Sequence, residues 1–117
     1  CLRRARDGRV KLADLGVAAE WQTGAGYDRS GTLPYMAPEV FDDAPKVGPT
    51  TDLYALGMTL ACLLLPADPF PPGPLGAVIE WAKNGPRPRL TEARPDLPTG
   101  LTALIDRMIA RNVDDRP

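Results

Sequence analysis

Residues 50–65 read TTDLYALGMTLACLLL, and this stretch decides the fold. Thr50, Thr51 and Asp52 are favoured at helix starts, and they stand directly before an apolar run that Pro66 ends. Apolar side chains fall on every face of the predicted helix. One face holds a leucine row at 53, 56, 60, 63 and 64, and the other faces carry Tyr54, Met58 and Ala61. A helix that is apolar all round is typical of a protein core. We therefore predict a central, buried helix.

Two more helices are predicted after it. Leu75, Val78, Ile79 and Ala82 have helical spacing, and Asn84-Gly85-Pro86 closes the pattern. Residues 85–98 hold four prolines and are predicted to be loop. The last helix is predicted from an i, i+3, i+4 pattern with Thr99 as its cap: Leu101, Leu104, Ile105, Met108 and Ile109.

The N-terminal third has a different character. Asp7-Gly8 is a tight-turn signal, and alternating residues 9–13 then indicate the second strand of a short hairpin. Residues 16–31 lack periodicity and are predicted to form a long loop, while Pro34 and Pro38 exclude a helix after it. The expected fold is mainly α, with one hairpin, one long loop and about three helices.

Composition excludes several functions. A net charge of -1 argues against nucleic acid or an anionic membrane as the main partner. With no histidine, the chain cannot contain a Ser-His or Cys-His pair. Cys1 and Cys62 do not form a disulfide framework or a zinc site, so we expect a reducing, cytoplasmic setting. The apolar run at 53–65 is too short to span a bilayer.

Four segments, in this order, resemble the protein kinase family. They are LADLG at 12–16, GTLPYMAPE at 31–39, DLYALG at 52–57 and DDRP at 114–117. A strand, the D-x-G, a loop and the A-P-E follow one another as they do in that family. The resemblance covers essentially the whole chain. It implies a C-terminal lobe, running from the strand before D-x-G to the late Arg-Pro, of a serine/threonine kinase that transfers phosphate from ATP to protein hydroxyls.

The resemblance assigns the chemistry to the long loop. Asp14 matches the aspartate that holds Mg²⁺ on the ATP phosphates, and Gly16 completes that motif. Leu15 replaces the usual phenylalanine, which leaves the switching behaviour open. Thr32 matches the threonine that lies near the catalytic base in serine/threonine kinases. Thr23 and Ser30 are candidate phosphorylation sites in the same segment.

Three other matched residues have supporting roles. Glu39 and Arg116 match an ion pair that fastens this segment to the helical core. Asp52 matches an aspartate that binds the backbone of the catalytic loop. The helix that precedes the central one in this family has no counterpart here, so we expect one flank of residues 53–65 to be exposed.

Several parts of a complete kinase do not occur in these residues. They are the Gly-rich loop, the strand lysine and the H-R-D-x-x-x-x-N loop. Cys1 opens the chain and Pro117 ends it, so we expect a segment of a longer protein that is inactive alone.

The alternative is a pseudokinase-like scaffold that binds proteins. The sequence upstream of Cys1 would discriminate the two. An unrelated helical domain would need four ordered matches by chance.

Overall fold

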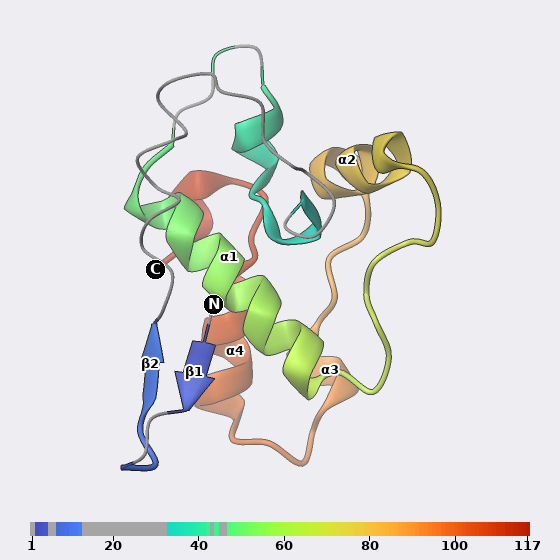
Figure 1. Ribbon diagram of the computed structural model, residues 1–117. Helices are drawn as coiled ribbons and strands as arrows, with labels where there is room; N and C mark the ends of the chain where they lie inside the picture. Colours follow the sequence, from blue (N-terminus) through green and yellow to red (C-terminus); the bar gives the residue numbers. More distant parts are fainter. Residues whose placement is uncertain (1, 5–6, 13–32, 43, 45–46) are drawn as a thin grey trace.

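The computed structural model describes residues 2–4, 7–12, 33–42, 44 and 47–117 (Figure 1). This part of the chain is mainly α, as the sequence predicted. Its elements in chain order are β1 (Leu2–Arg4), β2 (Val10–Leu12), the 3-10 turns η3 (Leu33–Tyr35) and η4 (Pro38–Phe41), α1 (Pro49–Leu64), α2 (Leu75–Asn84), α3 (Leu90–Ala93), α4 (Thr99–Met108) and the 3-10 turn η5 (Val113–Asp115). None of the helices in these ranges is long and apolar enough to cross a membrane.

The predicted hairpin is present. β1 and β2 are antiparallel, with Leu2 opposite Leu12 and Arg4 opposite Val10. Gly8 has a φ of 79°, a conformation that glycine adopts without steric cost. The carboxylate of Asp7 accepts a hydrogen bond of 3.1 Å from the backbone N–H of Arg9, which closes the turn. Residue 13, the last of the predicted strand, lies outside the described residues.

The start of α1 differs from the prediction. The helix begins at Pro49, one residue after Gly48, so Thr50, Thr51 and Asp52 lie inside its first turn. Proline is favoured there because the first helical N–H has no intrahelical partner. The Thr51 hydroxyl accepts a hydrogen bond of 3.1 Å from the Gly48 N–H, so it caps from within the helix.

The buried face of α1 is also not the one that its leucines suggested. Its buried residues are Thr51, Tyr54, Gly57, Met58 and Ala61. On the leucine row, Leu63 is 70% exposed and the other leucines are half-buried. The prediction of a helix buried on all sides is therefore wrong, whereas the expected exposed flank is present. Gly57 lies on this face because α4 and the residue after it approach α1 closely there, next to Met108 and Ile109.

Helix α4 supplies the facing surface. Thr102, Ile105 and Met108 are buried in it, and Ile109 directly after it is fully buried. Leu101 and Leu104, both predicted to face the core, are 42% and 45% exposed. Pro98, rather than Thr99, holds the cap position. The buried Thr102 hydroxyl donates to the Thr99 carbonyl at 3.1 Å, which satisfies a polar group at a core position.

Residues 85–98, predicted as loop, contain the short helix α3. The carboxylate of Asp106, on α4, accepts hydrogen bonds from the backbone N–H groups of Leu90 at 2.7 Å and Thr91 at 3.2 Å. It also accepts one from the Thr91 hydroxyl at 2.8 Å. A carboxylate from another helix therefore caps α3, and Leu90 is fully buried beside Ala61 and Ile105.

Helix α2 matches its predicted range and lies beside η3 and η4 (Figure 1). Lys83 on α2 forms an ion pair of 3.0 Å with Asp42 at the end of η4. Residues 33–41, which include both 3-10 turns, are called the 33–41 segment below. This segment lies between α2 on one side and α1 on the other.

We predict that Gly57→Ala destabilises the chain by about 1–3 kcal/mol, because a Cβ at this position would lie 2.7 Å from Met108 Cβ and 2.9 Å from Ile109 Cγ2. Gly76→Ala is the matched control, since nothing lies within 4 Å of its added Cβ. That variant should be neutral or gain up to about 1 kcal/mol from helix propensity. Urea unfolding of both variants measures the difference, and equal stabilities would contradict the close approach.

Candidate functional site

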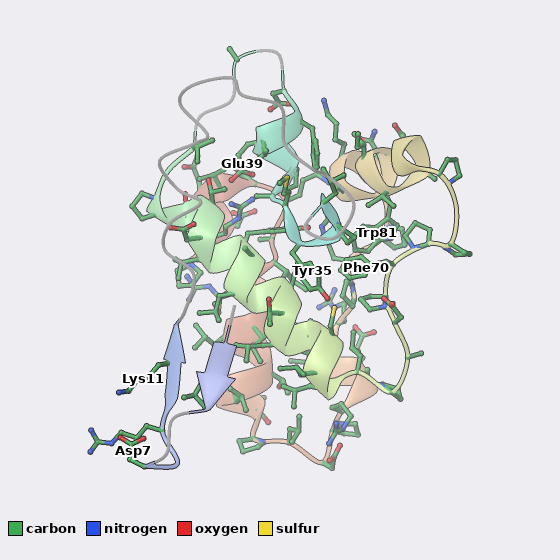
Figure 2. The ribbon with its side chains drawn as sticks, in the orientation of Figure 1. Asp7, Lys11, Tyr35, Glu39, Phe70 and Trp81 are labelled. Atoms are coloured by element: carbon green, nitrogen blue, oxygen red, sulfur yellow. The ribbon has the colours of Figure 1, made fainter. Side chains whose placement is uncertain are left out.

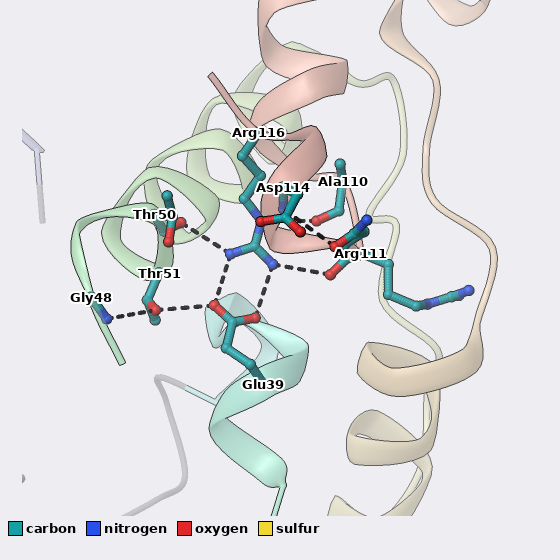
Figure 3. Close-up of polar contacts among 9 residues, drawn as sticks. Glu39, Gly48, Thr50, Thr51, Ala110, Arg111, Asp114 and Arg116 are labelled. Atoms are coloured by element: carbon teal, nitrogen blue, oxygen red, sulfur yellow. Dashed lines mark hydrogen bonds and ion pairs between the residues drawn. The ribbon is translucent and has the colours of Figure 1, made fainter. Parts of the chain in front are cut away.

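Glu39 and Arg116 form the ion pair that the sequence predicted (Figure 3). Arg116 Nη1 donates to Glu39 Oε1 at 2.7 Å, and Nη2 donates to Oε2 at 2.9 Å. Two parallel bonds of this kind match the planar guanidinium to the planar carboxylate. The Arg116 side chain is 0% exposed and that of Glu39 is 10% exposed. The pair is therefore shielded from water.

Arg116 uses the rest of its hydrogen-bonding capacity on backbone carbonyls. Nη1 also donates to Thr50 at 3.0 Å, Nε donates to Ala110 at 2.9 Å, and Nη2 donates to Arg111 at 3.3 Å. A guanidinium has five N–H groups, and all five have an acceptor here. One buried side chain thus joins η4, the first turn of α1 and the chain after α4.

Thr51 extends this network on the carboxylate side (Figure 3). Its hydroxyl donates to Glu39 Oε1 at 3.0 Å while it accepts from the Gly48 N–H. The sequence assigned this threonine only to helix capping. Its hydrogen bond to Glu39 could not be predicted from the neighbouring sequence, because the two residues belong to different elements.

The surroundings of Glu39 lower its pKa from the ordinary value of 4.5. Burial by itself raises the pKa, since it disfavours the charged carboxylate. Hydrogen bonds from Arg116, the backbone and Thr51, together with the positive charge of Arg116, outweigh that effect. The carboxylate is therefore held in its ionised form.

A series of aromatic and cationic side chains in contact with one another begins at Arg116. The Arg116 guanidinium lies 4.9 Å from the ring centre of Tyr54, which is fully buried. Arg87 lies 5.6 Å from the same ring and 5.0 Å from the ring of Trp81. Phe70 lies edge-on to Trp81 at 5.4 Å and to Tyr35 at 5.3 Å (Figure 2). Burial raises the pKa of Tyr54.

Sequence reasoning missed four residues of this series of aromatic and cationic side chains. Arg87 lies between two prolines in a stretch predicted as loop, and Phe70 lies in a proline-rich connection. Trp81 lies within the second predicted helix, but nothing in the sequence indicated that it contacts other aromatic side chains. Tyr35 was read only as part of a motif. These contacts join residues of different elements and connections, so no periodic pattern within one element predicts them.

The residues predicted to carry the chemistry lie outside the described residues. They are Asp14, Gly16, Thr23, Ser30 and Thr32. Asp52 is described: its side chain is exposed in the first turn of α1 and makes no hydrogen bond within the described part of the chain. Across the ranges that the structure covers, no group of three or more His, Cys, Asp or Glu side chains could hold a metal ion.

Known proteins of one family are similar to this chain. The family described as "Protein kinase domain" matches residues 2–117. Serine/threonine-protein kinase PknH of Mycobacterium tuberculosis is 33% identical over 115 residues, which is 95% of this chain and 18% of PknH. Probable serine/threonine-protein kinase PkwA of Thermomonospora curvata is 38% identical over 119 residues, 97% of this chain and 15% of PkwA.

A mammalian relative is similar over almost the whole chain as well. Sperm motility kinase Z of Mus musculus is 29% identical over 111 residues, which is 94% of this chain and 22% of that kinase. The chain therefore belongs to the protein kinase family. It spans less than a quarter of the length of each of these three relatives.

We predict that Arg116→Met destabilises the chain by about 3–5 kcal/mol, because it leaves the Glu39 carboxylate buried without its partner. The matched control is Lys83→Met, which breaks an ion pair whose side chains are 39% and 55% exposed. That change should cost less than about 1 kcal/mol. Denaturant unfolding at one pH compares the two, and a similar small loss in both would contradict a buried pair.

The Glu39 pKa gives a second prediction, on acid stability. Its folded-state pKa lies below the ordinary 4.5, so the pair contributes stability above 4.5 that is lost as the pH falls below it. The difference in unfolding free energy between wild type and Glu39→Gln should therefore shrink on going from about pH 7 to about pH 3. Unfolding curves measured across that range test this. A difference that is independent of pH would show that the ionised carboxylate is not the stabilising form.

Proposed function

We propose that this chain is part of the catalytic domain of a serine/threonine protein kinase, from the strand before D-x-G to the Arg-Pro after the last helix. The observation that carries this is the Glu39–Arg116 pair, which fastens the A-P-E turn to α1 and to the chain after α4. The positions of Glu39 and Arg116 in the sequence motifs predict the same pairing. The names of the bacterial relatives support the serine/threonine class.

In this proposal, Asp14 would hold Mg²⁺ on the ATP phosphates, and Gly16 would belong to the same cofactor-binding motif. A carboxylate oxygen is the kind of hard ligand that Mg²⁺ prefers. One carboxylate is not enough to hold the ion, so phosphate oxygens and water or a second side chain would supply the remaining ligands. The ion supplies charge neutralisation at the transferred phosphoryl group.

Thr32 has a positioning role in the proposal. It immediately precedes the 33–41 segment, whose far end the Glu39–Arg116 pair holds. A threonine hydroxyl there would align the catalytic base with the acceptor hydroxyl of a protein substrate. Thr23 and Ser30 would act differently, as regulatory sites whose phosphate could pair with arginines and order the segment.

The proposal also holds that these residues cannot catalyse transfer by themselves. Phosphoryl transfer depends on positioning and electrostatics, and the Gly-rich loop, the phosphate-binding lysine and the H-R-D base do not occur in this sequence. Those parts would come from upstream sequence in a longer protein. The C-terminal lobe then supplies one metal ligand, the substrate-facing segment and their support.

We predict that a longer natural protein containing these residues transfers phosphate from ATP to serine and threonine peptides, while the 117 residues alone do not. In the longer protein, Asp14→Asn should lower turnover by about 100-fold or more, because it removes a charged metal ligand but keeps the side-chain shape. Thr32→Ala should also lower turnover, through lost alignment. Transfer of radiolabelled phosphate measures all of these.

Unfolding curves of each variant serve as the control for loss of fold. Full activity in Asp14→Asn would overturn the metal assignment. If the longer protein folds and binds partners but never transfers phosphate, the scaffold alternative replaces the enzyme. Transfer by the isolated chain that Asp14→Asn abolishes would contradict the need for the missing parts.

A further inference from the structure

The contacts around Arg87 form one continuous path through the described residues. From Glu39 the path runs to Arg116 and then to the ring of Tyr54. Arg87 connects that ring to Trp81. Phe70 continues it edge-on to Tyr35. Cations and aromatic rings alternate in its first half, which is the favourable order because ring faces attract positive charge.

Both ends of this path lie on the same short stretch of chain. Glu39 belongs to η4 and Tyr35 belongs to η3, so the path leaves the 33–41 segment and returns to it. Between those ends it passes through Arg116 directly after η5, then α1, the chain before α3, α2 and the connection before α2. Figure 2 shows Tyr35, Phe70 and Trp81 together near η3 and α2. The segment is therefore held from two sides by one set of contacts.

Arg87 is the member that joins the two halves. Its Nη1 donates to the Trp81 carbonyl at 3.4 Å, and its Nη2 donates to the Ala82 carbonyl. These carbonyls belong to the last turn of α2, where a positive charge is also favoured by the helix dipole. Its Nε is buried and has no hydrogen-bond partner among the residues that the structure describes. The guanidinium of half-buried Arg87 therefore lies over two rings and is held by them as well as by the two carbonyls.

Helix α2 has its principal packing contacts with η3 and η4, and Arg87 extends its attachment to the core through Tyr54. Removing the Arg87 guanidinium would leave α2 packed on the 33–41 segment and η3 packed on α1, but it would remove the contact that joins Trp81 of α2 to Tyr54 of α1. The η3 end of the segment would then lose one of the contacts that support it, whereas the Glu39–Arg116 pair would still hold the η4 end.

We propose that Arg87 is a positioning residue, which fixes the substrate-facing 33–41 segment by stacking between Tyr54 and Trp81. This rests on the proposed function for the role of the segment, but its physical content is independent of catalysis. Arg87 acts through the two rings and contacts no reacting group. Its loss should therefore alter how the segment holds a protein substrate and leave ATP binding unchanged.

Hydrogen exchange in the longest natural protein that contains this chain tests the proposal. The reporter amides are those of Met36 and Val40, which donate to Leu33 and Ala37 carbonyls at 3.0 Å. Arg87→Met should speed their exchange about tenfold, since a desolvated cation–aromatic contact has roughly that effect on an equilibrium. The amide of Ile109, bonded to Ile105 at 3.2 Å, reports on the core and should not change.

Two variants complete the exchange experiment. Arg89→Met is the matched control, because Arg89 forms an exposed ion pair with Glu92 within the described ranges and its side chain is 67% exposed. It should leave all three reporter amides unchanged. Arg87→Lys keeps the positive charge and should restore part of the protection. Unchanged exchange at Met36 and Val40 in Arg87→Met would overturn the proposal. So would an equal increase at Ile109, which indicates a general loss of stability.

Steady-state kinetics provide a second readout. In a protein that transfers phosphate, Arg87→Met should raise the KM for a protein substrate about tenfold and leave the KM for ATP unchanged. Equal changes in both constants would overturn the positioning role. If the wild-type protein transfers no phosphate, the proposed function fails, and the exchange data still decide whether Arg87 holds the segment.

Discussion

The ion pair of Glu39 with Arg116 joins residues that are 77 positions apart, and the arrangement of the described residues depends on it. Burying two charges carries a large desolvation cost, which the pair offsets only if its geometry is good and its other hydrogen bonds are satisfied. Both conditions hold, because all five guanidinium N–H groups and both carboxylate oxygens have partners. The pair therefore fixes three parts of the chain relative to one another.

The contacts described above hold the 33–41 segment at both of its ends. Arg116 and Thr51 hold its η4 end, and Phe70 and α2 hold its η3 end. In the proposed kinase, catalysis depends on positioning, because the cofactor and its metal ion supply most of the chemistry. A lobe that contributes few reacting groups can still determine the rate, since it sets where the acceptor hydroxyl lies.

Much of the architecture could be predicted from local pattern. The hairpin and α2 were expected where they occur, because turn chemistry and periodicity act over a few residues. The core faces of α1 and α4 were predicted less well. Leucine content suggested burial of Leu63 and Leu104, but close packing of the two helices selects small residues such as Gly57. Hydrophobicity alone does not state which face a neighbouring helix approaches.

The sequence by itself determined the family, the order of its motifs and the pairing of Glu39 with Arg116. Each of these follows from residue identity at recognisable spacing. Only the tertiary structure decided that Asp106 caps α3 and that Arg87 stacks between Tyr54 and Trp81. Those contacts join separate elements whose relative placement is set by packing of the whole core. A side chain's partners across space are therefore not encoded in its neighbours along the chain.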